Sequence, residues 1–180
     1  MIGNTTRAEL VKEMLPFAII LGCSDARVPA EIVFDQGLGD LFVIRVAGNI
    51  VAPSQIDSVE FAAARAGTPL VVVLGHTNCG AVHATIEELS QTPDKQSHSL
   101  RSIVDRVRPS VEGLLKTDLK NDLNALVRQA VRSNVAVSVN HLRYGSAVLE
   151  KLVRNGDLRV VGAEYSLETG AVEFLEEATA

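Results

Sequence analysis

Apolar runs of strand length recur along the chain, and segments with helical periodicity separate them. The predicted strands are Pro16–Gly22, Leu41–Val46, Leu70–Gly75, Leu158–Tyr165 and Ala171–Leu175. The first is apolar throughout, as a strand covered on both faces is. The last two flank a turn at 168–170, which predicts a C-terminal antiparallel hairpin. This alternation predicts an α/β fold with a central, mainly parallel sheet flanked by helices.

The helical segments have their own start and stop signals. Proline suits the first helical turn and glycine the position after the last, which predicts a short helix from Pro29 through Phe34 and another from Pro53 to Gly67. A further helix begins around Cys79–Gly80. The remaining predictions are a helical region from Leu100 to about Val139, interrupted near Pro109 and around 113–118, and a helix over 144–155 that Gly156 ends.

The two polar or weakly patterned stretches predict less structure. Thr6–Met14 is a brief amphipathic segment that Pro16 ends, so we expect residues 1–15 to form a short N-terminal arm. Residues 91–99 are polar and predict a surface loop. With 180 residues and neither a linker nor an internal repeat, the chain suits a single domain over 1–180.

Charge and hydropathy limit the partners. The net charge is −5 and lysine and arginine form no dense block, so nucleic acid and anionic membranes are poor partners. No apolar stretch is long enough to span a bilayer, and the first residues lack the pattern of a secretory signal. We therefore expect a cytoplasmic protein.

Candidate chemistry gathers where two predicted strands end. Cys23 follows the first strand, and His76 and Cys79 follow the third with His-x-x-Cys spacing. In an open parallel sheet, ligands bind beyond the carboxyl ends of the strands. Thiolate sulfur and imidazole nitrogen are ligands that Zn²⁺ prefers. The sequence therefore predicts a zinc site formed by Cys23, His76 and Cys79.

Two other interpretations of these three residues stay open. They could be two buried free cysteines and a hydrogen-bonded histidine. They could also belong to a closed, structural zinc site, which needs four protein ligands. Asp25 is the nearby candidate for a fourth ligand, so the site is either open to water or closed by Asp25. If both cysteines bind metal, none remains for a disulfide, as expected in a reducing compartment.

Three ordered motifs extend this picture: Cys23–Pro29 (Cys-Ser-Asp-Ala-Arg-Val-Pro), Asp35–Asn49 and Gly75–Ala81. Through them the chain resembles the β-class carbonic anhydrases. The resemblance implies reversible hydration of carbon dioxide to bicarbonate and a proton, with zinc-bound hydroxide as the nucleophile. It also implies a homodimer or homotetramer.

The resemblance assigns Asp25 and Arg27 to a catalytic dyad that orients the hydroxide, with Asp25 binding zinc when Arg27 releases it. Arg27 beside Asp25 would keep the carboxylate ionised. The alternative is an ordinary surface ion pair, which contributes little. Phe42 corresponds to an apolar wall of the substrate pocket, although a core role on its strand is equally reasonable, and the Gly80 N–H is a candidate substrate donor.

Some positions depart from the family pattern. Ala26 replaces a serine, and Met14 replaces a glutamine whose amide donates to substrate across the dimer, which methionine cannot do. Ile20 stands where one branch has the tryptophan of a noncatalytic bicarbonate site, so we expect no such inhibition, and Arg45 then serves the fold or a subunit contact. His83 is the nearest spare histidine for proton transfer, if it is not simply packed.

Two further functions fit the same site. One is hydrolysis of carbonyl sulfide or carbon disulfide, which members of the same family carry out. The other is a catalytically weak, zinc-stabilised oligomer in which Asp25 permanently closes the site. For the hydratase, two thiolates would neutralise the zinc charge and weaken the Lewis acid, so we expect activity to rise toward alkaline pH.

Overall fold

The computed structural model describes residues 8, 10–12, 14–92 and 100–175, and a five-stranded sheet forms its centre. The strand order is β2-β1-β3-β4-β5. The first four strands are parallel, and β5 pairs antiparallel with β4. The predicted fold class and the C-terminal hairpin are therefore confirmed. The strands are β1 Ala18–Gly22, β2 Leu41–Arg45, β3 Leu70–His76, β4 Arg159–Tyr165 and β5 Val172–Leu175.

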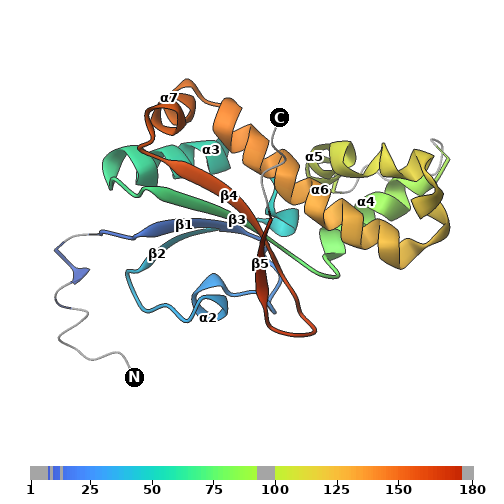
Figure 1. The fold of residues 1–180 in the computed structure, drawn as a ribbon, viewed down its shortest axis with the longest axis horizontal. Coiled ribbons are helices and arrows are strands. Elements are labelled where there is room, and N and C mark those ends of the chain that lie inside the picture. Colours follow the sequence, from blue (N-terminus) through green and yellow to red (C-terminus); the bar gives the residue numbers. More distant parts are fainter. Residues whose placement is uncertain (1–7, 9, 13, 93–99, 176–180) are drawn as a thin grey trace.

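Helices cover the sheet unequally (Figure 1). Three of them, α3, α6 and α7, pack on one face, whereas α2 lies against the other. Two more, α4 and α5, pack with the first half of α6 in a helical lobe beyond the carboxyl ends of the strands. The helices are α2 Ala30–Val33, α3 Pro53–Glu60, α4 Gly80–Ser90, α5 Arg101–Val111, α6 Leu123–Tyr144 and α7 Ala147–Asn155, with single turns at η1 Ala47–Asn49, η2 Phe61–Arg65, η3 Leu114–Lys116 and η4 Asp118–Asn121.

The central strands are buried on both faces. Successive side chains of a strand point to opposite faces, so Ile19 and Leu21 of β1 pack toward α3 and α6. Ile20, between them, packs toward α2. Burial on both sides explains why β1 is apolar without interruption.

Helix α6 lies directly on the sheet because two strands present glycine to it. A Cβ atom added to Gly75 of β3 would lie 2.5 Å from Val135 Cγ2, and one added to Gly162 of β4 would lie 2.7 Å from Val135 Cγ1. Both distances are shorter than any ordinary carbon contact. Val135 therefore fills a space that only glycine leaves open.

Two predicted helix boundaries are wrong. Pro109 does not interrupt the helix but lies in the last turn of α5, where its missing N–H costs one hydrogen bond and the buried Val107 and Val111 anchor the turn. Helix α6 does not end near Val139 but continues to Tyr144, because the buried stripe runs on through Leu142. The next helix then begins at 147, after Ser146 accepts hydrogen bonds from two N–H groups of its first turn.

Two other predictions fall mostly outside the described residues, namely the helix over Thr6–Met14 and the loop over 91–99. Within the described part of the chain, no helix combines the length and the hydropathy needed to cross a membrane.

Candidate metal centre and active site

Cys23, His76 and Cys79 meet at the carboxyl ends of the two central strands. Cys23 follows β1, His76 is the last residue of β3, and Cys79 caps the start of α4. Because β1 and β3 are adjacent and parallel, their ends deliver these residues to the same place. Their candidate ligand atoms lie within 4.8 Å of one another, and all three residues are buried. The predicted cluster is therefore present.

The His76 ring is oriented by its own chain. Its Nδ1 lies 2.8 Å from the carbonyl oxygen of Thr77, which only accepts, so Nδ1 carries the proton. Nε2 is then left with a lone pair, and it is buried without a hydrogen-bond partner among the described residues. Burial lowers the pKa of His76, but the Cys23 sulfur and the Thr77 carbonyl raise it by more. A buried, unpartnered nitrogen with its tautomer fixed in this way suits a metal ligand.

Cys23 and Cys79 interact through a hydrogen bond that shifts their pKa values in opposite directions. A hydrogen bond from Cys79 lowers the pKa of Cys23 to about 4, although burial alone would raise it. The same hydrogen bond, together with burial, raises the pKa of Cys79. The Gly48 N–H also donates to Cys23 Sγ over 3.3 Å. One negative charge is thus already stabilised, and a dication would stabilise the second.

The donor set fits a soft or borderline metal ion. Two sulfurs and one imidazole nitrogen are the ligands that zinc takes, and three protein ligands leave a fourth position for water or substrate. The cluster lies in the core of the helical lobe, where both cysteines are at most 5% exposed. Such burial excludes solvent from the protein side of the site.

Asp25 and Arg27 border this cluster and form a bidentate ion pair. Asp25 Oδ1 accepts from Arg27 Nε over 2.9 Å, and Oδ2 accepts from Nη2 over 2.7 Å. The Arg27 guanidinium holds the pKa of the Asp25 carboxyl well below its usual range. Asp25 Oδ2 is also 3.8 Å from His76 Nε2. The carboxylate is thus next to the cluster and turned toward its arginine.

Arg45 holds the segment that carries Cys23 and Asp25. Its Nε donates to the Cys23 carbonyl over 3.1 Å, and its Nη2 donates to the Asp25 carbonyl over 2.6 Å. Arg45 therefore has a structural role at the end of β2, in agreement with the expectation that it serves the fold.

A second support comes from α6, and sequence reasoning missed it. Asn134 Nδ2 donates to the Gly48 carbonyl over 2.7 Å, and Ser138 Oγ donates to the Asn49 carbonyl over 2.9 Å. Gly48 is the residue whose N–H reaches Cys23 Sγ. The available signal was a pair of polar residues, four apart, on the otherwise apolar buried stripe of this helix.

The remaining predicted site residues are dispersed. Phe42 pairs with Ile19 in the sheet, about four residues or ~13 Å short of the cluster along the strand, and its ring lies 6.2 Å from that of Phe61. Its role as a pocket wall stays a prediction. Gly80 is exposed at the start of α4, and a Cβ added there would meet nothing within 4 Å. The backbone at Gly80 is therefore open to a small ligand.

Three further residues named from the sequence lie around the site or before β1, namely His83, Met14 and Ala26. His83 is half-buried on α4, one turn beyond Cys79. Met14 is 44% exposed before β1, and Ala26 is exposed between the residues of the dyad.

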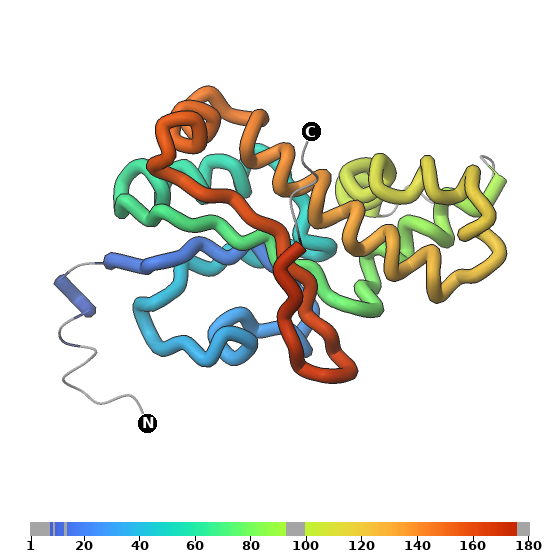
Figure 2. The backbone as a smooth tube through the Cα atoms, in the orientation of Figure 1, coloured from blue at the N-terminus to red at the C-terminus, as the bar shows by residue number. Residues whose placement is uncertain are grey.

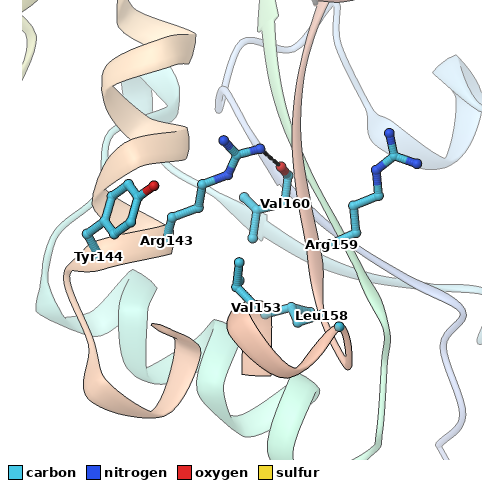
Figure 3. Close-up of a pocket in the computed structure, with 7 residues that line it drawn as sticks. Arg143, Tyr144, Val153, Leu158, Arg159 and Val160 are labelled. Atoms are coloured by element: carbon cyan, nitrogen blue, oxygen red, sulfur yellow. Dashed lines mark hydrogen bonds between the residues drawn. The ribbon is translucent and has the colours of Figure 1, made fainter. Parts of the chain in front are cut away.

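A separate pocket of about 400 Å³ lies at the amino end of β4, at the opposite end of the sheet from the cluster (Figure 3). Its two arginines do not converge. Arg143 donates to the Val160 carbonyl, whereas Arg159 points away on the other side of the strand. The pocket therefore offers no focused charge for a ligand.

Comparison with known proteins agrees with this geometry. The sequence profile of the carbonic anhydrase family matches residues 18–172. The carbonic anhydrase of Mycolicibacterium smegmatis is 39% identical over 172 residues, covering 96% of this chain and 81% of that protein.

Solved structures with the same fold show which class of carbonic anhydrase the chain is similar to. The β-carbonic anhydrase CafA of Aspergillus fumigatus matches with a TM-score of 0.85 and 26% identity, covering 98% of this chain and 83% of that chain. One of two tetrameric β-carbonic anhydrases from Sordaria macrospora shares the fold with a TM-score of 0.84 and 23% identity, over 97% of this chain and 87% of that one. By sequence and by fold, this chain belongs to the β-class carbonic anhydrase family.

Proposed function

We propose that this protein is a zinc-dependent carbonic anhydrase that interconverts carbon dioxide and bicarbonate. The observation that carries the proposal is the buried cluster of Cys23, His76 and Cys79 with the paired carboxylate of Asp25 at its border. Membership of the carbonic anhydrase family supports the same reaction.

In this proposal Cys23, His76 and Cys79 hold Zn²⁺. The metal supplies a Lewis acid that makes hydroxide available from water near neutral pH. The chain contributes two thiolates, which neutralise the dication, and an imidazole whose lone pair on Nε2 is free to bind.

Asp25 and Arg27 orient the nucleophile. An ionised carboxylate only accepts hydrogen bonds, so Asp25 fixes the direction of a donor beside it. Arg27 occupies both carboxylate oxygens and draws Asp25 away from the metal position, which favours the open site over the closed one. The Gly80 N–H and Phe42 are proposed substrate contacts, the second of them in the assembled protein.

We further propose a homodimer or homotetramer that works in the cytoplasm. The Sordaria macrospora relatives with this fold are tetrameric. Neither cysteine forms a disulfide in the structure, and both must remain reduced to bind metal, which suits a reducing compartment.

A stopped-flow assay of carbon dioxide hydration on the zinc-loaded chain tests this function. We expect one zinc per chain by elemental analysis and turnover that rises from neutral to alkaline pH. His76→Ala should lose both zinc and turnover, and His141→Ala, an exposed position on α6, should keep both. Absence of bound metal, or full turnover in His76→Ala, would overturn the proposal.

A parallel assay with carbonyl sulfide separates the alternatives. Turnover of that substrate without carbon dioxide hydration would identify a hydrolase. Stoichiometric zinc without either activity would identify a zinc-stabilised oligomer.

A further inference from the structure

The two residues between His76 and Cys79 are held by a carboxylate from a distant part of the chain. Glu168, in the turn between β4 and β5, accepts from Thr77 Oγ1 at Oε2 over 2.7 Å. Its other oxygen, Oε1, accepts from Asn78 Nδ2 over 3.1 Å. One side chain therefore binds both residues that separate two of the cluster's donors.

Thr77 links this carboxylate to the His76 ring. The Thr77 carbonyl accepts from His76 Nδ1 and so sets the tautomer and the orientation of the imidazole. The Thr77 hydroxyl donates to Glu168 and accepts from the Leu167 N–H over 3.0 Å. The Thr77 N–H donates to the Tyr165 carbonyl over 3.0 Å. Every polar group of Thr77 is thus engaged, and Glu168 holds the one that can rotate.

Asn78 is the point at which the chain turns toward Cys79. Its φ of 55° lies in the left-handed region, which non-glycine residues seldom occupy and which asparagine tolerates better than most. The hydrogen bond from Asn78 Nδ2 to Glu168 fixes this turn from outside. A change in the turn would alter the separation of His76 and Cys79.

The hairpin that carries Glu168 is itself anchored. Arg132 of α6 pairs with Glu164 of β4 over 2.8 Å and with Glu173 of β5 over 2.5 Å. Within the turn, Ser166 Oγ donates to Glu168 Oε2 over 3.2 Å. Figure 2 shows the hairpin passing the segment that leads from β3 into α4. Glu168 therefore reaches the ligand segment from a fixed base.

We propose that Glu168 is a positioning residue that holds the Thr77–Asn78 turn, keeps His76 and Cys79 at ligand spacing, and thereby sets the affinity of the site for its metal. The inference rests on the proposed metal site. The side-chain hydrogen bonds of Glu168 go to Thr77, Asn78 and Ser166 and not to Cys23, His76 or Cys79, so it acts on the donors through Thr77 and Asn78.

Zinc affinity, measured by competition with a chromophoric chelator, tests this role. Mutation of a residue that holds a metal ligand from the outer shell typically lowers metal affinity by about 10–100-fold. Glu168→Ala should therefore raise the zinc Kd by about tenfold or more. The matched control is Glu173→Ala, which makes the same change in the same hairpin without touching Thr77. It removes the exposed partner of Arg132 and leaves the buried Arg132–Glu164 pair that anchors the hairpin. We expect its Kd to stay within about twofold of wild type. Glu168→Gln, which retains one acceptor oxygen, should be intermediate.

A double-mutant cycle identifies the route of the effect. Thr77→Val removes the hydroxyl and should itself raise the Kd, and adding Glu168→Ala to it should cost less than in the wild-type background, because the two residues share one interaction. In the cobalt-substituted protein, the thiolate charge-transfer band should shift in Glu168→Ala and stay unchanged in Glu173→Ala.

Thermal unfolding of each metal-free variant shows whether the chain still folds. If Glu168→Ala does not fold, Thr77→Val supplies the test. Equal Kd values for wild type and Glu168→Ala, or equal losses in Glu168→Ala and Glu173→Ala, would overturn the positioning role while leaving the metal site intact. A wild-type chain that binds no zinc would instead overturn the proposed function and this inference together.

Discussion

Asp25 is the residue on which two sets of bonds converge. Its side chain binds the guanidinium of Arg27, and its carbonyl accepts from Arg45. The Arg27 side chain is 57% exposed, so the pair is held from the solvent side while the carboxylate borders the buried cluster. Exposed ion pairs contribute little to stability. The value of this pair therefore lies in the direction and charge that it gives to the carboxylate.

Asp25→Asn tests that view. The amide keeps the shape of the side chain but lacks the charge, so we expect kcat/KM for carbon dioxide hydration to fall. Loss of one charge-assisted hydrogen bond is worth about 1.5–3 kcal/mol, which corresponds to about ten- to a hundredfold in rate. Zinc content should not change, because the three donors of the cluster remain. Asp157→Asn, an exposed position at the other end of the sheet, is the control. Unchanged kinetics, or loss of zinc, in Asp25→Asn would contradict this role.

The site residues differ in whether a short sequence motif is enough to predict their place. Cys23, Asp25 and Arg27 lie in one short motif after a strand, so sequence alone could place them together. Asn134 and Glu168 lie far along the chain from the segments they hold, with separations of 86 residues from Gly48 and 91 from Thr77. Contacts of that kind depend on how the helices and the hairpin dock. A local pattern, such as the polar pair on the buried stripe of α6, can mark one residue of the contact but does not identify its partner.

Among the elements, α6 does most to join the parts of the molecule. It packs against β3 and β4 in the sheet, against α4 and α5 in the lobe, and against α7. Its close approach to the sheet depends on the glycines at 75 and 162, which leave room for Val135. Small residues in the strands thus decide how near the helix can lie.

Gly162→Ala should therefore destabilise the fold. The added methyl group would meet Val135 Cγ1 at 2.7 Å, and overpacking of a core costs about 1–3 kcal/mol. Gly113→Ala is the matched control, since its φ is −68° and an added Cβ would meet nothing within 4 Å. That variant should be neutral or slightly stabilising. Urea unfolding of both variants measures the difference, and equal free energies of unfolding would show that the helix can move away without cost.

Element prediction from the sequence succeeded where the signal was an apolar run bounded by turns, as in β1, β3 and the β4–β5 hairpin. It failed at the ends of α5 and α6. Pro109 is tolerated because buried neighbours anchor the last turn, and α6 continues past Val139 because Leu142 is buried against the sheet. In both cases tertiary packing outweighs the local signal.

At the scale of the whole molecule, the cluster lies where the sheet meets the helical lobe. Cys23 comes from the end of β1, and Cys79 from the start of α4 in the lobe. Both belong to the apolar core that the lobe builds with α5 and α6. A metal held here would connect segments that are otherwise joined by packing and hydrogen bonds.

Removal of the metal should therefore lower the stability of the entire chain. Zinc at a hundredfold excess over its Kd stabilises the folded state by about 2.7 kcal/mol. For a chain of this size, that corresponds to a rise in Tm of about 5–10 °C. We expect treatment with a chelator to remove this increment, and added zinc, but not magnesium, to restore it. Circular dichroism melts provide the measurement, and a Tm that is indifferent to zinc would contradict a metal link between sheet and lobe.

Val135 packs against Gly75 and so places α6 next to the strand end that carries the His76 imidazole. Gly75 immediately precedes His76, and the neighbouring Asn134 is bonded to Gly48, whose N–H reaches Cys23. One stretch of the helix thus rests on both segments that present donor atoms. Sliding of α6 along its axis would therefore displace both segments together and change the spacing of the donor atoms at the proposed metal site.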